Sequence, residues 1–314
     1  MTPKIPIIAQ PTLGRAHFRA ADGAVLPIRS WLPPRSEPQA IVLALHGFND
    51  YSNAFDQPGL QLSSKGVAVF AYDQRGFGNA PGRGRWAGNA AYETDAIAVV
   101  GQLRRRYPHV PLFLLGESMG GAVVMTAMTA SAPNSVDGVI LSAPAVWSRD
   151  MMPWYQRALL ALVSTALPDM KLTGSGMQVR ASDNMELLRG MGRDRLVIKE
   201  TRVDAIEGLT DLMDMAQARA GALPIPALVL YGEHDQIIPA EPVVAMLEKM
   251  RARPTIRLAI YPEGYHLLLR DLHADQPLAD IAAWVKNPRA QLPSGHERAL
   301  GDRTWLDESR ALGP

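Results

Sequence analysis

Short, mainly apolar runs alternate with segments of helical length through the first half of the chain. The apolar runs are Ala40–Leu45, Val67–Tyr72, Val110–Leu115 and Val136–Leu141, and the helix-length segments include Ala90–Tyr107 and Met119–Ala130. A continuous apolar run of this length is typical of a strand that is buried on both faces. Because parallel strands separated by helices are joined by right-handed crossovers, the pattern predicts a parallel sheet with helices on both faces.

Two further features complete the predicted sheet. Arg15–Arg19 and Val25–Trp31 flank the turn signal Asp22-Gly23, which predicts an antiparallel hairpin at one edge. Ala227–Tyr231 and Ile256–Tyr261 resume the parallel pattern later in the chain. We therefore expect an α/β protein with a mostly parallel eight-stranded sheet.

Residues 147–222 interrupt this rhythm. Their longest strand-like apolar run is Leu196–Ile198, and most of the segment is helical in character and rich in Met and Leu. The pattern predicts a helical insertion between the sixth strand and the next, which separates two parts of one core, residues 15–146 and 223–287. Residues 288–314 form a polar C-terminal tail, interrupted by Pro and Gly, which we expect to be poorly ordered.

The sharpest chemical signal is the sequence Gly116-Glu117-Ser118-Met119-Gly120, which lies between an apolar strand and a helix. In this G-x-S-x-G pattern the Ser stands on a tight strand-to-helix turn with strained backbone geometry, where the two glycines avoid a steric clash. The five-residue pattern alone also fits a Gly-rich turn with an inert Ser. The strand before it and the helix after it predict a nucleophile elbow, with Ser118 as the nucleophile and Gly116 and Gly120 as its support.

A serine hydroxyl needs a general base, and the base needs an acid that orients it. In this arrangement the acid and the His follow the Ser along the chain, each in a loop after a later strand. Asp235 and His266 fit, because they follow Ala227–Tyr231 and Ile256–Tyr261. Glu233 competes in the same loop, and we favour Asp235 on its resemblance to the usual G-x-x-D loop.

The seven histidines can be separated by their positions. His266 has the chain order and loop position expected of the general base. His46 closes the strand Ala40–Leu45 and belongs to the other half of the site. The others lie outside such loops, in the expected last helix, or beside the acid itself: His17, His109, His234, His273 and His296.

Acyl transfer also needs N–H donors for the oxyanion of the tetrahedral intermediate. His46-Gly47-Phe48 follows a buried strand, and such a loop can present the backbone N–H of Phe48. The N–H of Met119, the residue after Ser118, is the second expected donor of the oxyanion hole. The alternative is that His46-Gly47 only ends a strand.

Composition narrows the chemistry. The formal net charge is +1, so nothing suggests the broad cationic field that a nucleic-acid partner requires. The dense basic run Arg104–Arg106 stands where a helix is expected to end, where cations suit the helix dipole. The absence of Cys excludes disulfides and thiolate catalysis. No H-E-x-x-H or comparable ligand cluster occurs, so no metal is expected.

Two stretches of the chain bear on where the protein is located in the cell. Met1–Leu13 lacks the apolar centre of a signal peptide. Ala158–Leu167, the richest apolar stretch, falls short of the roughly 18 residues of a membrane span. We expect a cytoplasmic protein, while transient contact with a membrane surface, the oligomeric state and a removed leader are left open.

The motifs together resemble one group of enzymes. They are His46-Gly47-Phe48, Tyr72–Gly78, Gly116–Gly121, Gly232–Asp235 and Gly264–His266, and they cover most of the chain. In order and spacing they resemble the serine hydrolases grouped as monoacylglycerol lipases, lysophospholipases and serine-aminopeptidase-like α/β hydrolases. The resemblance implies the α/β-hydrolase fold, ester hydrolysis without a cofactor, and a cap over the site formed by residues 147–222.

Two departures from the group concern loops around the predicted triad. The group usually has D-x-R-G-x-G-x-S, whereas Asn79 and Ala80 follow Gly78 here. It typically has H-G-x-G in the oxyanion loop, whereas Asn49 takes the last place. Both changes lie where they can reshape an acyl pocket. Asp73 is expected to be structural, because Ser118 already occupies the nucleophile position.

The leading hypothesis is a serine hydrolase that cleaves a carboxylic ester through an acyl-enzyme on Ser118. Its substrate would be a monoacylglycerol, a lysophospholipid or another small acyl ester, admitted by apolar cap residues at near-helical spacing. These residues are Met151, Met152, Trp154, Tyr155, Leu159, Leu160, Val163 and Leu167, which equally suit a helix packed on the core.

Two alternatives belong to other classes. An aminopeptidase-like amide hydrolase needs an acidic patch for the substrate's amino group, and the cap offers Asp183, Glu186, Asp194, Asp204, Glu207, Asp211 and Asp214. An exposed amphipathic helix explains these acids equally well. A non-catalytic ligand-binding protein could keep the fold, but an intact triad argues against it.

Overall fold

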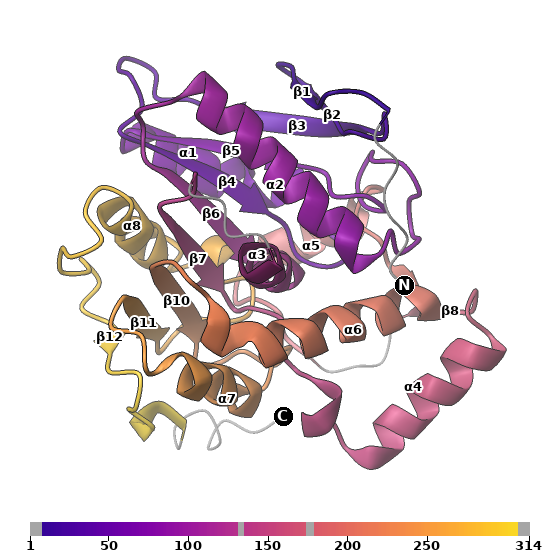
Figure 1. The fold of residues 1–314 in the computed structure, drawn as a ribbon. Helices are drawn as coiled ribbons and strands as arrows, with labels where there is room; N and C mark the ends of the chain where they lie inside the picture. Colours follow the sequence, from indigo (N-terminus) through magenta and orange to yellow (C-terminus); the bar gives the residue numbers. More distant parts are fainter. Residues whose placement is uncertain (1–7, 131–134, 174–178, 307–314) are drawn as a thin grey trace.

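A ten-stranded sheet forms the centre of the computed structural model, which describes residues 8–130, 135–173 and 179–306. Eight of its strands are those predicted, and a two-residue strand extends each edge. In spatial order the strands are β1 (Thr12–Leu13), β2 (His17–Arg19), β3 (Val25–Trp31), β5 (Val67–Tyr72), β4 (Ala40–Leu45), β6 (Leu112–Glu117), β7 (Gly138–Ser142), β10 (Ala227–Gly232), β11 (Ile256–Tyr261) and β12 (Glu297–Arg298) (Figure 1).

The direction of the strands follows the prediction. The six central strands, β5, β4, β6, β7, β10 and β11, run parallel to one another. Strands β1, β2 and β3 pair antiparallel at one edge of the sheet, and β12 pairs antiparallel at the other. The predicted antiparallel hairpin is therefore confirmed, with His17 opposite Pro27 in its register. The carboxyl ends of all the parallel strands lie on the same side of the sheet, and the loops that follow the strands meet there.

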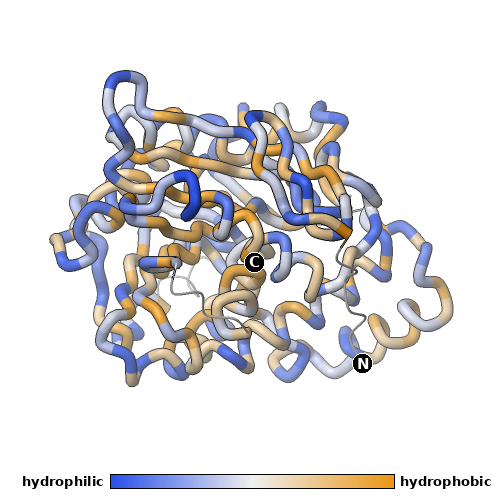
Figure 2. The backbone as a smooth tube through the Cα atoms, turned by 45° about the horizontal axis from the view of Figure 1, so that its top comes forward, coloured by the Kyte–Doolittle hydropathy of each residue, from blue (hydrophilic) through white to orange (hydrophobic). Residues whose placement is uncertain are grey.

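Alternate residues of each central strand enter different cores, because side chains alternate between the two faces of a sheet. In β4, Ile41, Leu43 and Leu45 join one apolar cluster, and the intervening Ala40, Val42 and Ala44 join the other. Hydrophobic stretches accordingly run along the interior strands in Figure 2. The helices on the first face are α2 (Asn89–Arg106), α3 (Met119–Ala130), α6 (Val203–Arg219) and α7 (Ala240–Met250), and those on the second are α1 (Asp56–Ser64) and α8 (Asp275–Trp284).

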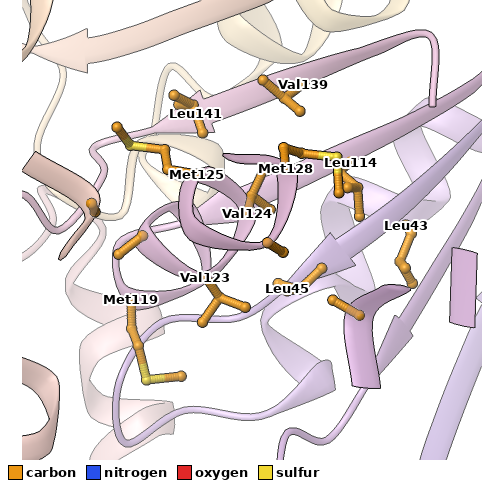
Figure 3. Packing of buried hydrophobic residues seen from close by; sticks show 14 of the residues in the cluster. Leu43, Leu45, Leu114, Met119, Val123, Val124, Met125, Met128, Val139 and Leu141 are labelled. Atoms are coloured by element: carbon orange, nitrogen blue, oxygen red, sulfur yellow. The ribbon is translucent and has the colours of Figure 1, made fainter. Parts of the chain in front are cut away.

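Helix α3 lies at the middle of the first face. All its residues from Met119 to Met128 are buried. Figure 3 shows its Val124 and Met128 among side chains of β4, β6 and β7, with Met119 on its first turn. Because α3 is surrounded by packed side chains, its N-terminus and the turn that precedes it are held rigidly over the sheet.

The chain between β7 and β10 forms the predicted helical insertion together with two short strands. Its elements are η2 (Arg149–Met151), α4 (Trp154–Ala166), β8 (Lys171–Thr173), α5 (Met185–Arg193), β9 (Glu200–Arg202), α6 and η3 (Ala220–Ala222). Strands β8 and β9 pair antiparallel and were not predicted, because they are short and lack an apolar run. Helix α6 differs from the rest of the insertion, since it packs against α3 on the core.

Helix α4 projects away from the body of the molecule (Figure 1). None of its residues is buried, but the helix contacts α6 and the preceding Met152 packs against the core, so the interpretation of this stretch as a helix packed on the core holds only in part. Among the helices of the described residues, none has the length and apolar character needed to cross a membrane.

Residues 288–306 of the C-terminal tail form a strand and a buried aromatic contact, so the prediction of poor order is wrong for them, and residues 307–314 lie outside the described part of the chain. Glu297–Arg298 forms β12 on the edge of β11, where the Glu297 carboxylate accepts from the Arg257 guanidinium at 2.6 Å. The Trp305 side chain is 2% exposed and packs on the Tyr231 ring, with 5.5 Å between ring centroids. One strand pairing and one buried aromatic anchor a segment that is otherwise polar.

We predict that Trp305→Ala lowers the free energy of unfolding by about 3–5 kcal/mol, because it empties a buried aromatic site. Trp154→Ala is the matched control, since Trp154 is 73% exposed and its removal leaves no cavity. Denaturant unfolding of both variants measures the difference. Equal stabilities would show that the tail does not contribute to the core.

Candidate active site

Ser118 occupies a strained turn between β6 and α3. Its φ of 53° lies in the left-handed region, which is uncommon for residues other than Gly. Hydrogen bonds hold this conformation: the Ser118 N–H donates to the Ser142 carbonyl at 3.0 Å, and the Ser118 carbonyl accepts from the Gly121 and Ala145 N–H groups at 2.9 Å each. This is the geometry of a nucleophile elbow, where the strain presents the hydroxyl above the sheet.

The glycines beside Ser118 are required by the closeness of two backbones. A Cβ atom on Gly120 would lie 2.1 Å from the Leu45 carbonyl oxygen of β4. A Cβ atom on Gly116 would lie 2.4 Å from the backbone of Gly120. Backbone atoms inside a packed sheet cannot retreat, so any other residue at either position would push α3 off the strands.

Asp235 and His266 meet above neighbouring strands. Asp235 follows β10 and His266 follows β11, and the two strands are paired with Gly232 opposite Tyr261. His266 Nδ1 lies 2.8 Å from Asp235 Oδ2, and both side chains are buried. The other carboxylate oxygen of Asp235 accepts from the backbone N–H groups of Ile237 and Ile238 at 2.8 and 3.0 Å. Of the two acids that the sequence offered in this loop, Asp235 therefore contacts the imidazole.

Two opposing effects act on the His266 imidazole. Burial disfavours the charged ring and lowers its pKa, but the Asp235 carboxylate raises it, so that the pKa of His266 lies above its usual 6.5. An ionised Asp235 accepts a hydrogen bond and cannot donate one. Nδ1 of His266 therefore carries the proton, and Nε2 of the neutral ring is left as the basic nitrogen.

The loop after β4 lies against Ser118. A Cβ atom on Gly47 would contact the Ser118 Cβ at 3.4 Å. His46 is fully buried, accepts from the Gln74 N–H at Nε2 (3.0 Å), and donates from Nδ1 to the Gly47 carbonyl (2.8 Å). Burial lowers the pKa of His46, which keeps the ring neutral as these two bonds require. His46 thus fixes the loop that leads to Phe48, whose ring packs on Phe77 with 5.6 Å between centroids.

Asn49 stands at the position where the H-G-x-G pattern has its last Gly. Its φ of 65° is left-handed, a conformation that Gly adopts freely and Asn tolerates better than most residues. Its side-chain amide donates to Thr201 Oγ1 at 2.7 Å, and its carbonyl accepts from the Ile198 N–H at 2.9 Å. The substitution therefore keeps the turn and adds a bond to the insertion.

A buried arginine joins three loops of this region. Arg270 ends η4 (Leu268–Arg270), close after His266. Its guanidinium donates to Asp50 Oδ2 at 2.8 Å and to Glu117 Oε1 at 2.6 Å, and all three side chains are buried. Sequence reasoning missed this cluster, because its members lie 153 and 220 residues apart and no local pattern marks them.

Residues 180–184 of the insertion, called here the strap, lie along the His266 loop. The Ala181 carbonyl accepts from the Leu267 N–H at 2.9 Å, and Ser182 Oγ bonds to Asp271 Oδ1 at 2.5 Å. Further along, Asn184 donates to the Arg270 carbonyl at 3.1 Å. The guanidinium at the other end of the strap, that of Arg180, stacks over the Tyr265 ring at 5.1 Å. The strap attaches the insertion to the loop that carries His266.

A cavity of about 480 Å³ with both polar and apolar lining lies beside the Arg270 cluster, between α1 and α5. Side chains of Asp50, Tyr51, Asp194, Arg270 and Asp271 line it. Within the described residues, no group of three or more His, Asp or Glu side chains is arranged to hold a metal ion.

The fold and site define the class of the protein. Its sheet, with an edge hairpin, helices on both faces and an inserted helical segment, is the α/β-hydrolase fold, as in a solved soluble variant of monoglyceride lipase from Saccharomyces cerevisiae. That structure has a TM-score of 0.74 and 19% identity, and the match covers 92% of this chain and 99% of the other. At that identity the likeness concerns the fold alone.

The chain belongs to the family described as serine aminopeptidase S33, which matches residues 36–273. Among its relatives, the monoglyceride lipase of Mus musculus is 27% identical, over 89% of this chain and 92% of that protein. The monoacylglycerol lipase of Mycolicibacterium smegmatis is 25% identical, over 86% of this chain and 96% of the relative. The predicted resemblance to serine hydrolases of the monoacylglycerol lipase group is confirmed.

Asp271 should make stability depend on pH. Burial raises the pKa of Asp271 to about 6, although bonds from Ser182 and the Tyr265 N–H oppose the shift. Between the unfolded pKa, near 3.8, and pH 6, the unfolded chain releases this proton while the folded one keeps it, so stability falls as pH rises. The loss should reach roughly 3 kcal/mol.

We predict that Asp271→Asn, which has no proton to lose, removes this part of the pH dependence. Denaturant unfolding of both proteins at pH 4 to 7.5 measures it, and the difference in stability between variant and wild type should change across that interval. Curves that stay parallel would contradict a raised pKa at Asp271.

Proposed function

We propose that this protein is a serine hydrolase that cleaves carboxylic esters through an acyl-enzyme on Ser118. The observation that carries the proposal is the 2.8 Å bond between His266 and Asp235, which orients an imidazole at the sheet edge where Ser118 stands on its elbow. Strands β6, β10 and β11 are parallel, so the loops that follow them share that edge. Nucleophile, base and orienting acid are the components that acyl transfer needs.

Each step follows from these roles. His266 Nε2 takes the proton of Ser118 Oγ as the oxygen attacks the ester carbonyl carbon. Backbone N–H groups of Phe48 and Met119 stabilise the oxyanion of the tetrahedral intermediate. The C–O bond to the alcohol then breaks, and His266 returns the proton to the leaving alkoxide. A water molecule, deprotonated by the same imidazole, attacks the acyl-enzyme, and the carboxylic acid leaves Ser118 with its proton restored.

The substrate class that we propose is a monoacylglycerol, a lysophospholipid or another small acyl ester. The names of the two curated relatives support a glycerol ester. Residues 147–222 would act as a cap, since the strap and the Asn49 bonds attach them to the loops on both sides of the site.

Several ion pairs within the insertion bear on the aminopeptidase-like alternative. Arg149 makes ion pairs with Glu207 at 2.6 Å, with Asp211 at 2.8 Å, and with Asp214. Arg202 pairs in the same way with Asp204. Because one guanidinium serves three carboxylates, an excess of negative charge remains, and this pairing does not decide between the two substrate classes. The names of the curated relatives favour an ester. The aminopeptidase-like alternative is therefore the less favoured one.

We also propose that α4 meets a lipid surface. Trp154, Leu159 and Leu162 are 73%, 61% and 68% exposed on this projecting helix. Exposed apolar side chains gathered on one element are typical of an interaction surface, and Trp is favoured at the membrane–water interface. A helix that rests on lipid could bring a monoacyl substrate to the site without spanning the bilayer.

Ser118→Ala should reduce kcat for p-nitrophenyl esters by roughly 10⁴- to 10⁶-fold, because no other group supplies the attacking oxygen. Ser148→Ala is the matched control, since Ser148 is similarly buried and has no proposed role. Circular dichroism verifies the fold, and a fluorophosphonate probe should label the wild type and not Ser118→Ala. Full activity in Ser118→Ala would end the proposal.

Rates across esters from acetate to palmitate, including monoacylglycerols and lysophospholipids, would define the acyl preference. Aminoacyl-naphthylamides measured alongside separate ester from amide hydrolysis. Faster cleavage of the amides would favour the aminopeptidase-like alternative.

The double variant Trp154→Ser, Leu162→Ser should bind lipid vesicles at least about tenfold more weakly, because each change removes apolar area from the lipid contact. Its activity on a soluble short-chain ester should stay unchanged. Leu60→Ser, at a residue that is 51% exposed on α1, is the control. Co-sedimentation with phosphatidylcholine–phosphatidylglycerol vesicles measures binding, and equal binding of all three proteins would contradict a role for α4.

A further inference from the structure

The Arg270 side chain connects three of the chain segments on which the proposed chemistry depends. Arg270 lies in η4, shortly after His266 in the chain. Asp50 lies in the loop that begins with His46, and Glu117 immediately precedes Ser118. The bonds of 2.8 Å to Asp50 and 2.6 Å to Glu117 thus connect the base loop, the oxyanion loop and the nucleophile elbow through one planar group. A guanidinium with fixed donor directions constrains the relative positions of its partners more than a flexible ammonium would.

We propose that Arg270 is a positioning residue that, through Asp50 and Glu117, holds the oxyanion loop, the nucleophile elbow and the His266 loop in register. The proposal rests on the proposed function, since it gives Arg270 a role in aligning His266 with Ser118. Arg270 itself does not contact substrate in this role.

The composition of the cluster argues against a purely stabilising purpose. Burying three charged side chains carries a desolvation cost that their attraction only partly offsets, and apolar side chains of similar volume usually stabilise a core as well or better. The cluster also holds one cation for two carboxylates. In the described part of the chain, Arg270 Nε and Glu117 Oε2 are buried without a hydrogen-bond partner, a further cost. An arrangement with these costs is better explained by the geometry that it imposes.

The same ions act on the imidazole of His266. The charged groups that face it are Asp235 from the loop after β10, Glu117 from β6, and Arg270 from η4. Asp235 and Glu117 favour the protonated ring, and Arg270 disfavours it. Glu117 and Arg270 therefore act in opposite directions on the pKa of His266, so that a change in either side chain can be followed through the titration of the imidazole.

The experiment measures kcat/KM against pH for the wild type, Glu117→Gln, Arg270→Lys and Arg270→Met, with active sites titrated by a fluorophosphonate. Removing the Glu117 charge should move the acid limb of the profile to lower pH, and removing the Arg270 charge should move it to higher pH. Arg270→Met should also lower kcat per titrated site by about 10- to 100-fold, because the loops lose their register. Arg270→Lys keeps the positive charge but lacks the planar N–H donors of the guanidinium. It should leave the acid limb of the pH profile near its wild-type position and recover part of kcat.

Arg104→Met is the control. The Arg104 guanidinium donates to the Ser135 and Val110 carbonyls and pairs with Asp137. These residues lie at the amino ends of β6 and β7, whereas the site lies at the carboxyl ends of the strands. This variant should keep the wild-type kcat and pH profile.

Glu117→Gln preserves shape, so it keeps the test valid if Arg270→Met does not fold. Wild-type kcat per titrated site together with an unmoved acid limb in Glu117→Gln would overturn the proposal. A loss confined to stability or to the number of titrated sites would overturn it too. Failure of the proposed function is a separate result, since it would appear as full activity in Ser118→Ala.

Discussion

The chain turns from β6 into α3 in so little space that no side chain fits at Gly116 or Gly120, the glycines on either side of the Glu117-Ser118-Met119 turn. A Cβ atom on Gly120 would lie 2.1 Å from the Leu45 carbonyl, and this contact sets how closely α3 approaches β4. The left-handed φ of Ser118 follows from the same crowding, and the buried residues of α3 stabilise it from below. The position of the Ser118 hydroxyl is thus a consequence of core packing, and every other element of the site is arranged around it.

Charge is concentrated at this one edge of the sheet. The Asp235–His266 bond and the Arg270 cluster lie side by side there, and the Coulombic effect of Glu117 and Arg270 on His266 couples them. Surroundings of low dielectric constant strengthen each of these interactions, so their energies depend strongly on the distances between the side chains. The insertion is attached to the same loops, through the strap on one side and Asn49 on the other. Movement of the insertion would therefore act directly on the loop of His266.

The accuracy of the sequence predictions follows from the kind of signal that each element carries. Ala40–Leu45 and Val67–Tyr72 were predicted with their observed bounds, because an apolar run buried on both faces has sharp ends. The run Val110–Leu115 is shifted by two residues, to Leu112–Glu117, since Pro111 has no N–H for the ladder and the strand continues into the motif. Strands β1, β8, β9 and β12 were missed, because two or three residues are too few to carry a periodic signal. Trp305 was missed because its contact with Tyr231 joins distant parts of the chain.

The sequence by itself determined the order of strands and helices, the elbow around Ser118, and Asp235 and His266 as the candidates that follow it. These features depend on local periodicity, on the small size of Gly, and on chain order, all of which can be read residue by residue. Only the tertiary structure decided that Asp235 rather than Glu233 contacts the imidazole, that Arg270 joins Asp50 to Glu117, and that α4 stands exposed. Those outcomes depend on which side chains meet across hundreds of residues, and pairing of that kind arises only when the sheet brings its loops to a common edge.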